Sequence, residues 1–233
     1  MPPPKVKPND PVHRGFEENV VCWLQQHAYH VAPPSTIYDR WPEELQDLIK
    51  RRWSFTALKV RTESDRIVMH RILPVDFLLD IKGGKTGEDL CIEALPYLLA
   101  CDAAERFGVR RLYAAYHPRY NREYGFWARR DGVRLRELRL TDKLSLEQNT
   151  RIWDRCREWW HDLPVRRQPP TACGSDDPFF VIDKSLLIGE GGLPHWQDLV
   201  VALADGETGS RKTAPPVPWI TPPLIDGQQK SLF

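Results

Sequence analysis

The sequence predicts a mixed α/β protein in which helices flank a mixed β-sheet. An apolar stripe at helical spacing opens the chain, strand-like segments rich in β-branched residues follow it, and a helix ending at Gly108 separates these segments from further strands. The chain has 233 residues, of which 41% are hydrophobic. This length and composition allow one large domain, or one domain with a small appendage.

The first third of the chain contains two helical and three strand-like segments. Phe16, Val20 and Leu24 recur at helical spacing, which predicts a helix over residues 15–31, ended by Pro33-Pro34. Pro42 can occupy the first turn of a helix, which predicts a short helix over 42–52. Partly alternating segments rich in β-branched residues predict strands over 55–61, 66–73 and 75–81.

Thr86 and Asp89 have the spacing of a capping box and predict a helix that ends at Phe107, because Gly108 follows. Pro96 falls inside this segment and must either kink the helix or mark its true start. The later elements are predicted as strands over 109–117, 124–129 and 133–140, a helix over 144–163, a linker over 165–177, and a strand–helix pair over 179–188 and 193–204.

Composition divides the chain into four regions. The two ends are rich in proline and polar residues, which is typical of disordered segments. The regions are a disordered N-terminus (1–13), an α/β core (14–143), a helical and α/β extension (144–204) and a disordered tail (205–233).

Charge and cysteine content exclude several classes of protein. The net charge of +1 excludes a globally basic nucleic-acid binder, so any such contact would need a local patch. The five cysteines include no Cys-x-x-Cys pair, which favours reduced thiols and a cytoplasmic location. We expect no membrane association, because no signal peptide or membrane-length apolar run is visible. Gly84-Lys85-Thr86 lacks the earlier glycine of a Walker loop, which argues against nucleotide hydrolysis.

The predicted strand over 75–81 ends in a carboxylate and an amine two positions apart. Because side chains alternate along a strand, Asp80 and Lys82 are expected on the same face. Such a pair can bind a divalent metal ion and hold a nucleophilic water molecule. The alternative is an ordinary strand whose charged end protrudes into solvent.

The order helix, strands, Asp-x-Lys strand, helix and strand resembles the core of the PD-(D/E)XK nuclease superfamily over about residues 14–118. The resemblance implies a restriction-endonuclease-like α-β-β-β-α-β core and a metal-dependent DNA nuclease acting in DNA repair, recombination or replication. Its matching positions are Glu17 on the opening helix, Asp65 before the hairpin, and Asp80 with Lys82. The resemblance further implies that Asp65 and Asp80 hold Mg²⁺ or Mn²⁺. Lys82 would orient or deprotonate the water, and Glu17 would complete the shell through a bound water.

A second register of the same motif remains open. Asp76 stands in a literal Pro-x-Asp, and residues 90–95 could form the next strand, with Glu93 as its acid and Pro96 in the first turn of a helix. Leu95 would then replace the lysine, which suggests a degenerate site. The alternative functions are therefore a non-catalytic DNA-binding adaptor, or a strand-cleaving subunit of a transposition or phage complex.

Residues 109–140 carry nine arginines against three acidic residues, with aromatic residues interleaved. This combination suits phosphate contacts and base stacking, although it also fits a charged, solvated sheet face. The arginines expected to bind DNA are Arg110, Arg111, Arg119, Arg122, Arg129 and Arg130.

The last five residues, Gln229-Lys230-Ser231-Leu232-Phe233, are similar to the peptide by which bacterial replication and repair proteins bind the DNA sliding clamp. The resemblance implies that Leu232 and Phe233 fill an apolar pocket and that Gln229 makes polar contacts. Alternatively, the terminal Leu-Phe folds back onto the domain. The expected partners are therefore DNA and a sliding clamp, within a homo-oligomer or a larger complex.

Overall fold

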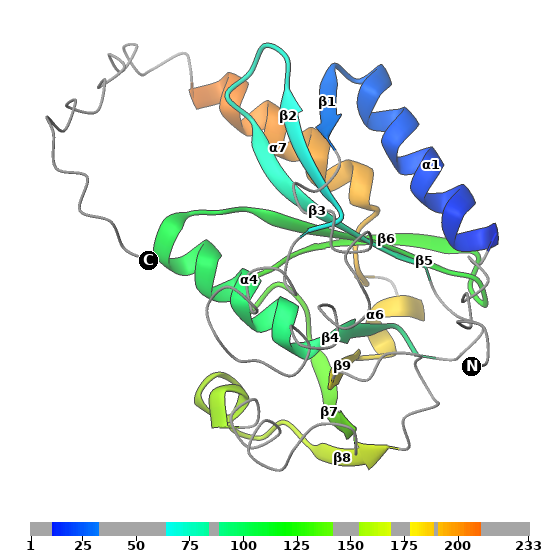
Figure 1. The fold of residues 1–233 in the computed structure, drawn as a ribbon, viewed down its shortest axis with the longest axis vertical. Helices are drawn as coiled ribbons and strands as arrows, with labels where there is room; N and C mark the ends of the chain where they lie inside the picture. Colours follow the sequence, from blue (N-terminus) through cyan, green and yellow to red (C-terminus); the bar gives the residue numbers. More distant parts are fainter. Residues whose placement is uncertain are drawn as a thin grey trace, which may run out of the picture.

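The structure is a computed structural model, and it describes residues 11–32, 64–83, 89–141, 154–168, 178–188 and 191–210 (Figure 1). The described chain is of the α/β class and contains two mixed sheets. The first sheet has the strand order β1-β2-β3-β5-β6, and its strands are β1 (Tyr29–Ala32), β2 (Arg66–His70), β3 (Asp76–Gly83), β5 (Arg111–His117) and β6 (Arg122–Trp127). In this sheet β3 and β5 run parallel, whereas the other pairs of neighbouring strands run antiparallel.

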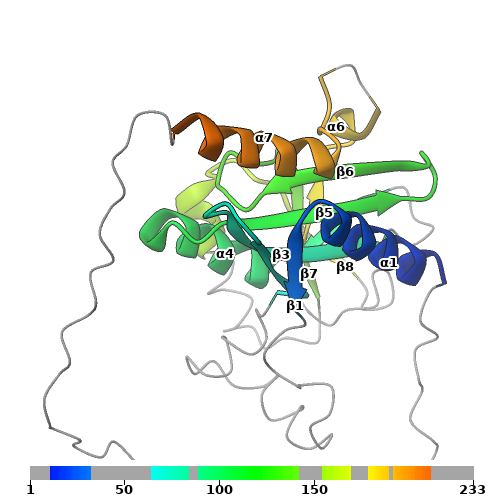
Figure 2. The same ribbon diagram turned by 90° about the horizontal axis from the view of Figure 1, so that it is seen from above.

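Two helices cover one face of the first sheet. Helix α1 (Pro11–Gln26) packs on β1 and β3, and α7 (Trp196–Ser210) packs on β5 and β6 (Figure 2). Alternate residues of β3 point toward this core, which also includes α1 side chains and Trp196. The inward residues of β3 are Phe77, Leu79 and Ile81. Since side chains alternate along a strand, Asp80 and Lys82 face the opposite side.

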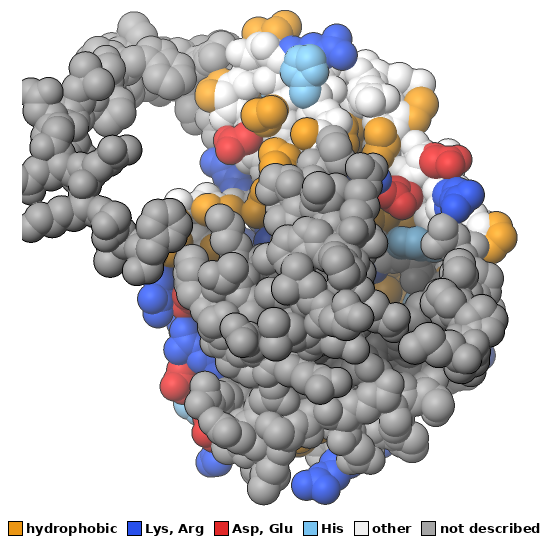
Figure 3. Space-filling model, in the orientation of Figure 1, with side chains coloured by type: hydrophobic (Ala, Val, Ile, Leu, Met, Phe, Trp, Pro, Cys, Tyr) orange, Lys and Arg blue, Asp and Glu red, His pale blue; other side chains and the backbone are white. Residues whose placement is uncertain are grey.

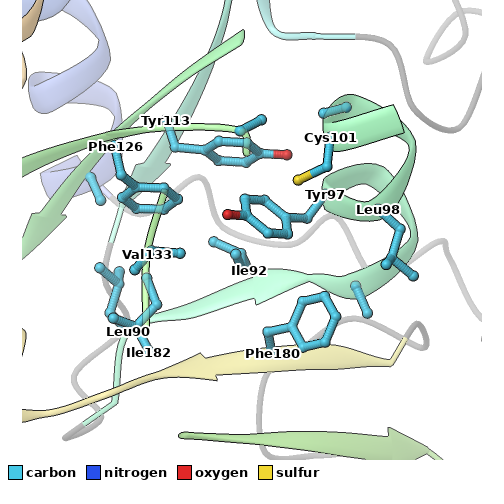
Figure 4. Packing of buried hydrophobic residues seen from close by; sticks show 14 of the residues in the cluster. Leu90, Ile92, Tyr97, Leu98, Cys101, Tyr113, Phe126, Val133, Phe180 and Ile182 are labelled. Carbon is cyan, nitrogen blue, oxygen red and sulfur yellow. The ribbon is translucent and has the colours of Figure 1, made fainter. Parts of the chain in front are cut away.

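The second sheet packs with α4 against that opposite side. Its strand order is β4-β9-β7-β8, with β4 (Cys91–Glu93), β9 (Phe179–Ile182), β7 (Leu135–Thr141) and β8 (Val165–Gln168). Helix α4 (Ala94–Phe107) follows β4, and the short α6 (Ser185–Ile188) follows β9. Tyr97 of α4 makes edge contacts with Tyr113 of the first sheet and Phe180 of the second, so this cluster joins the two sheets (Figure 4).

Residues from the predicted extension (144–204) complete both of these cores. Strand β9 pairs with β4 and β7, and β8 pairs with β7. Gly125 of β6 lies so close to α7 that an added Cβ would be 2.4 Å from Trp196 Cα. A glycine is therefore required there for helix and sheet to approach.

The first helix differs from its prediction at both ends. Helix α1 begins at Pro11, inside the segment predicted to be disordered, and ends at Gln26 instead of Val31. Ala28 adopts a left-handed conformation with φ 67°, which ends the helix and lets β1 begin at Tyr29. The apolar spacing alone could not distinguish this short edge strand from another helical turn.

The helix start predicted at the capping box of Thr86 and Asp89 is also wrong. Residues 91–93 form β4, and α4 begins at Ala94, so Pro96 lies in its first turn, where its missing N–H is not needed. This agrees with the strand expected in the second register. The predicted end is confirmed, because Gly108 caps α4 with φ 66° and its N–H bonds to the Ala104 carbonyl at 3.0 Å.

Two further boundaries are corrected. Part of the predicted linker over 165–177 is a strand, because residues 165–168 pair in parallel with β7. Part of the predicted disordered tail is helical, since α7 continues to Ser210. Of the predicted helix over 144–163, the described portion is helical over 154–159. The predicted elements over 42–52 and 55–61, Thr86 and the clamp-like peptide lie outside the described residues. Within the described chain, no helix is both long and apolar enough to cross a membrane.

Candidate active site

Strand β3 carries Asp80 and Lys82 to the face that it shares with β5. The parallel register places Asp80 beside Tyr113 and Lys82 beside Ala115. The Asp80 side chain is buried, with only 5% of its surface exposed, whereas Lys82 retains 25%. The site therefore lies in the carboxyl-terminal half of β3, beside the first half of β5.

Two further charged groups, Glu93 and Arg111, contact this pair. The Lys82 ammonium lies 3.9 Å from Asp80 Oδ1 and 3.5 Å from Glu93 Oε2. Glu93 is positioned by its place at the end of β4, immediately before α4. On the other side, Arg111 Nη1 lies 3.5 Å from Asp80 Oδ2. Each oxygen of Asp80 thus faces a different cation.

Asp65 is anchored next to the same strand. Its Oδ2 accepts a hydrogen bond at 2.6 Å from the backbone N–H of Ile81, the residue between Asp80 and Lys82. Arg66 donates to the Asp65 backbone carbonyl at 2.6 Å and also pairs with Glu17 of α1. Asp65 therefore belongs to the site, and Glu17 is linked to it through Arg66.

The charges at the site shift one another's pKa values. Burial raises the pKa of Asp80 to about 6, and the positive charges of Lys82 and Arg111 only partly oppose this effect. Burial lowers the pKa of Lys82, but the carboxylates of Glu93 and Asp80 outweigh burial, so its pKa lies above the ordinary value. Lys82 is therefore an ammonium at neutral pH, and Asp80 changes its charge near pH 6.

The donor set fits a hard divalent cation of the Mg²⁺ type. Asp80 Oδ2 is buried and has no hydrogen-bond partner among the described residues, so it keeps a lone pair for a further ligand. The same residues contain no group of three or more acidic, histidine or cysteine side chains arranged to hold a metal. Mg²⁺ does not require such a group, because it is often bound by one or two carboxylates with waters and substrate phosphates.

The residues of the second register are separated by the fold. Glu93 contacts Lys82 and so joins the site. Asp76 is exposed and lies at the opposite end of β3, beside Met69, so about 13 Å of strand separates it from Asp80. The structure thus combines the acid-x-Lys pair of the first register with the acid of the second.

The predicted DNA-binding arginines divide into three groups. Arg111 is a correction, because its side chain is only 9% exposed and faces Asp80, so it is not a surface residue. Arg122 begins β6 beside His117, and Arg119 lies in the same hairpin, beyond the end of β3 that carries Lys82. The other three lie at the opposite end, before β5 or after β6, and are Arg110, Arg129 and Arg130.

The expected stacking of bases is corrected for three of the six aromatic residues in this region. Tyr113, Tyr124 and Phe126 are buried, because they lie on the inner face of the first sheet. Some arginines here are paired with acids; Arg130, for example, lies 2.6 Å from Glu105. Among the side chains visible in Figure 3, acidic and basic groups are likewise interspersed.

Two residues of the site have roles that the sequence reasoning missed. The second register takes Glu93 as the acid of the acid-x-Lys motif. In the structure Glu93 is instead the ion-pair partner of Lys82. Arg111 was expected on the surface, but it is the buried partner of Asp80. Two strands that are joined through a helix usually pair in parallel. The order of the elements therefore indicated that β5, which carries Arg111, lies beside β3.

The chain matches no protein-family model and no curated protein sequence. A functional proposal therefore rests on the geometry of the site, which is formed by Asp65, Asp80, Lys82, Glu93 and Arg111.

Proposed function

We propose that this chain is a metal-dependent nuclease that hydrolyses phosphodiester bonds of DNA on a restriction-endonuclease-like core. The observation that carries the proposal is the convergence of Asp65 on the Asp80-Ile81-Lys82 segment of β3. The element order α1, β1, β2, β3, α4, β5 supports it, since this is the order that the family resemblance implies, with the short β4 added before α4.

Asp65 and Asp80 are the residues that would hold Mg²⁺ or Mn²⁺. When bound, such an ion offsets negative charge on the phosphate and supplies a water that ionises near neutral pH. Asp80 must give up its proton to act as a ligand, which its pKa of about 6 permits at neutral pH.

Lys82 has a narrower role than the resemblance implies. Because its pKa is raised, it stays protonated and cannot take a proton from water at neutral pH. We assign it the task of offsetting the negative charge that develops on the phosphate oxygens. Glu93, 3.5 Å from the ammonium, holds Lys82 in place for this role. Glu17 positions Arg66, and through it Asp65, rather than completing a metal shell.

DNA would approach the carboxyl end of β3. Arg119 and Arg122 are the arginines of the predicted set that lie at this end of the sheet. Arginine contacts to phosphate fix the position of a duplex without reading its sequence. Because Tyr113, Tyr124 and Phe126 are buried, binding here is expected to depend mainly on charge.

The sliding clamp remains a proposed partner. Gln229, Leu232 and Phe233 resemble the clamp-binding peptide, and a Pro-rich segment separates them from the end of α7. An apolar Leu-Phe pair that enters a pocket of the clamp is a coherent binding mode. It would place the nuclease at sites of DNA replication or repair.

One observation favours the alternative of a non-catalytic DNA-binding adaptor. Both oxygens of Asp80 face cationic side chains, Lys82 at 3.9 Å and Arg111 at 3.5 Å. These two cations neutralise the carboxylate in place of a metal ion.

The two functions are separated by cleavage of labelled duplex, single-stranded, flapped and junction DNA with Mg²⁺ or Mn²⁺. We expect cleavage by the wild type, loss in Asp80→Asn and Lys82→Ala, and wild-type activity in Asp76→Asn. Asp76 is a matched control because the same chemical change is made on the same strand, outside the site. DNA binding without cleavage of any substrate, alone or with a sliding clamp, would favour the adaptor.

A further inference from the structure

Arg111 is a buried cation with an incomplete set of partners. Its Nε and Nη1 atoms have no hydrogen-bond partner among the described residues, although Nη1 lies 3.5 Å from Asp80 Oδ2. Burying a charged group in this way is costly unless another charge compensates it. The nearby compensating charge is Asp80, which is itself buried.

The position of Arg111 is fixed by the backbone around it. It lies on β5 opposite Leu78 of β3, and its carbonyl accepts a hydrogen bond from Ala128 N–H at 2.8 Å. Strand β5 is flanked by β3 and β6, so Arg111 cannot leave Asp80 by a movement of a sheet edge. The guanidinium therefore acts as a permanent charge beside the carboxylate.

The charges at the site leave room for one divalent ion. When ionised, Asp65, Asp80 and Glu93 supply three negative charges against the two positive charges of Lys82 and Arg111, so the net charge is −1. One divalent ion changes it to +1, which a phosphate diester then neutralises. A second ion would raise it to +3 in a partly buried site, where repulsion is poorly screened.

The two ions of a two-metal site lie about 4 Å apart, a separation that one carboxylate can bridge. Asp80 is the most buried of the three acids, but its Oδ2 faces Arg111. Arg111 covers one side of Oδ2, and the remaining lone pair can take one ion. A second ion on the same oxygen would have to displace the guanidinium.

We infer that Arg111 is a positioning residue that takes the place of a second metal ion and limits this site to one divalent cation per chain. The inference rests on the proposed nuclease function and specifies the metal requirement of the same site. Arg111 acts through Asp80 and need not touch the substrate.

The test is a titration of the full chain with MnCl₂ at pH 8 without DNA. Binding is measured by calorimetry and by the electron paramagnetic resonance signal of free Mn²⁺. Arg111→Met removes the charge, Arg111→Lys keeps it, and Arg106→Met removes an exposed arginine, 61% accessible, as a control. We expect one Mn²⁺ per wild-type chain. Arg111→Met should bind Mn²⁺ about tenfold more tightly, because the repulsion is lost, whereas the other two variants should match the wild type.

A tighter complex is a result that a purely structural role for Arg111 does not predict, because structural damage weakens metal binding. Two ions per wild-type chain would overturn the inference and leave the nuclease proposal intact. The inference would also be overturned if Arg111→Met has a wild-type circular dichroism spectrum and binds Mn²⁺ no more tightly than the wild type does. If Arg111→Met does not fold, the wild-type stoichiometry decides the question. No Mn²⁺ binding by the wild type would overturn the proposed function itself.

Discussion

Replacing Asp80 with asparagine should stabilise the folded protein at pH 8 while it removes the proposed activity. The pKa of Asp80 rises from an ordinary value of 3.8 to about 6 on folding, because burial disfavours its charged form more than Lys82 and Arg111 favour it. Each pKa unit corresponds to about 1.4 kcal/mol. Even with its pairing to Lys82 and Arg111 included, ionised Asp80 therefore costs the fold about 3 kcal/mol relative to its neutral form, which Asn, an uncharged side chain of similar shape, mimics.

The pH dependence follows from this direction. Below about pH 4 the Asp80 carboxyl is protonated in both states, so its ionisation has no effect on stability. Between about pH 4 and pH 6 the unfolded chain loses the proton first, and the wild type loses stability relative to Asp80→Asn. Above about pH 7 the whole cost is present, and it remains at higher pH.

Thermal unfolding of the two proteins from pH 4 to pH 8 measures this difference. For a chain of this size about 3 kcal/mol corresponds to a rise in Tm of roughly 6–12 °C at pH 8, shrinking toward zero at pH 4. Mg²⁺ should raise the Tm of the wild type and not that of Asp80→Asn, because a ligand of the folded state alone stabilises it. A variant less stable than the wild type at pH 8 would refute the reasoning and show that Asp80 is a structural ion-pair partner.

Three further predictions concern the sheet, the DNA and the clamp. Gly125→Ala should lower the free energy of unfolding by at least about 2 kcal/mol in denaturant titrations, since its Cβ would overlap the Trp196 backbone; an unchanged midpoint would contradict the packing of α7 on β6. Replacing Arg119 and Arg122 together with Gln should weaken DNA binding and reduce its salt dependence by about two phosphate contacts in fluorescence anisotropy, and an unchanged salt slope would exclude them. Removing residues 226–233 should abolish binding to a sliding clamp in surface plasmon resonance but leave cleavage of naked DNA intact; clamp binding that survives would exclude the terminal peptide.

The geometry of β3 could be predicted from the sequence because it depends on local rules. Period-two alternation places Asp80 and Lys82 on one face, and the structure has them 3.9 Å apart. The end of α4 at Gly108 is equally local, because a left-handed glycine ends a helix whatever surrounds it. Both features need only the few residues around them.

The parts that sequence reasoning missed depend on contacts between distant segments. Strand β4 has three residues, and it is a strand because it pairs with β9, whose Phe179 lies opposite Glu93. The burial of Arg111 depends on β5 lying parallel to β3 and on the second sheet that covers this face. Neither arrangement is encoded in local propensity, so Arg111 is indistinguishable in the sequence from the exposed Arg110.

The most direct test of the central claim is metal-dependent DNA cleavage by Lys82→Ala beside the matched Asp76→Asn control. Both variants change one charged side chain of β3, but Lys82 contacts Asp80 and Glu93, whereas Asp76 lies at the far end of the strand. We expect Mg²⁺- or Mn²⁺-dependent cleavage by the wild type and by Asp76→Asn, and loss of cleavage in folded Lys82→Ala. Cleavage that persists in Lys82→Ala but is lost in Asp76→Asn would contradict it.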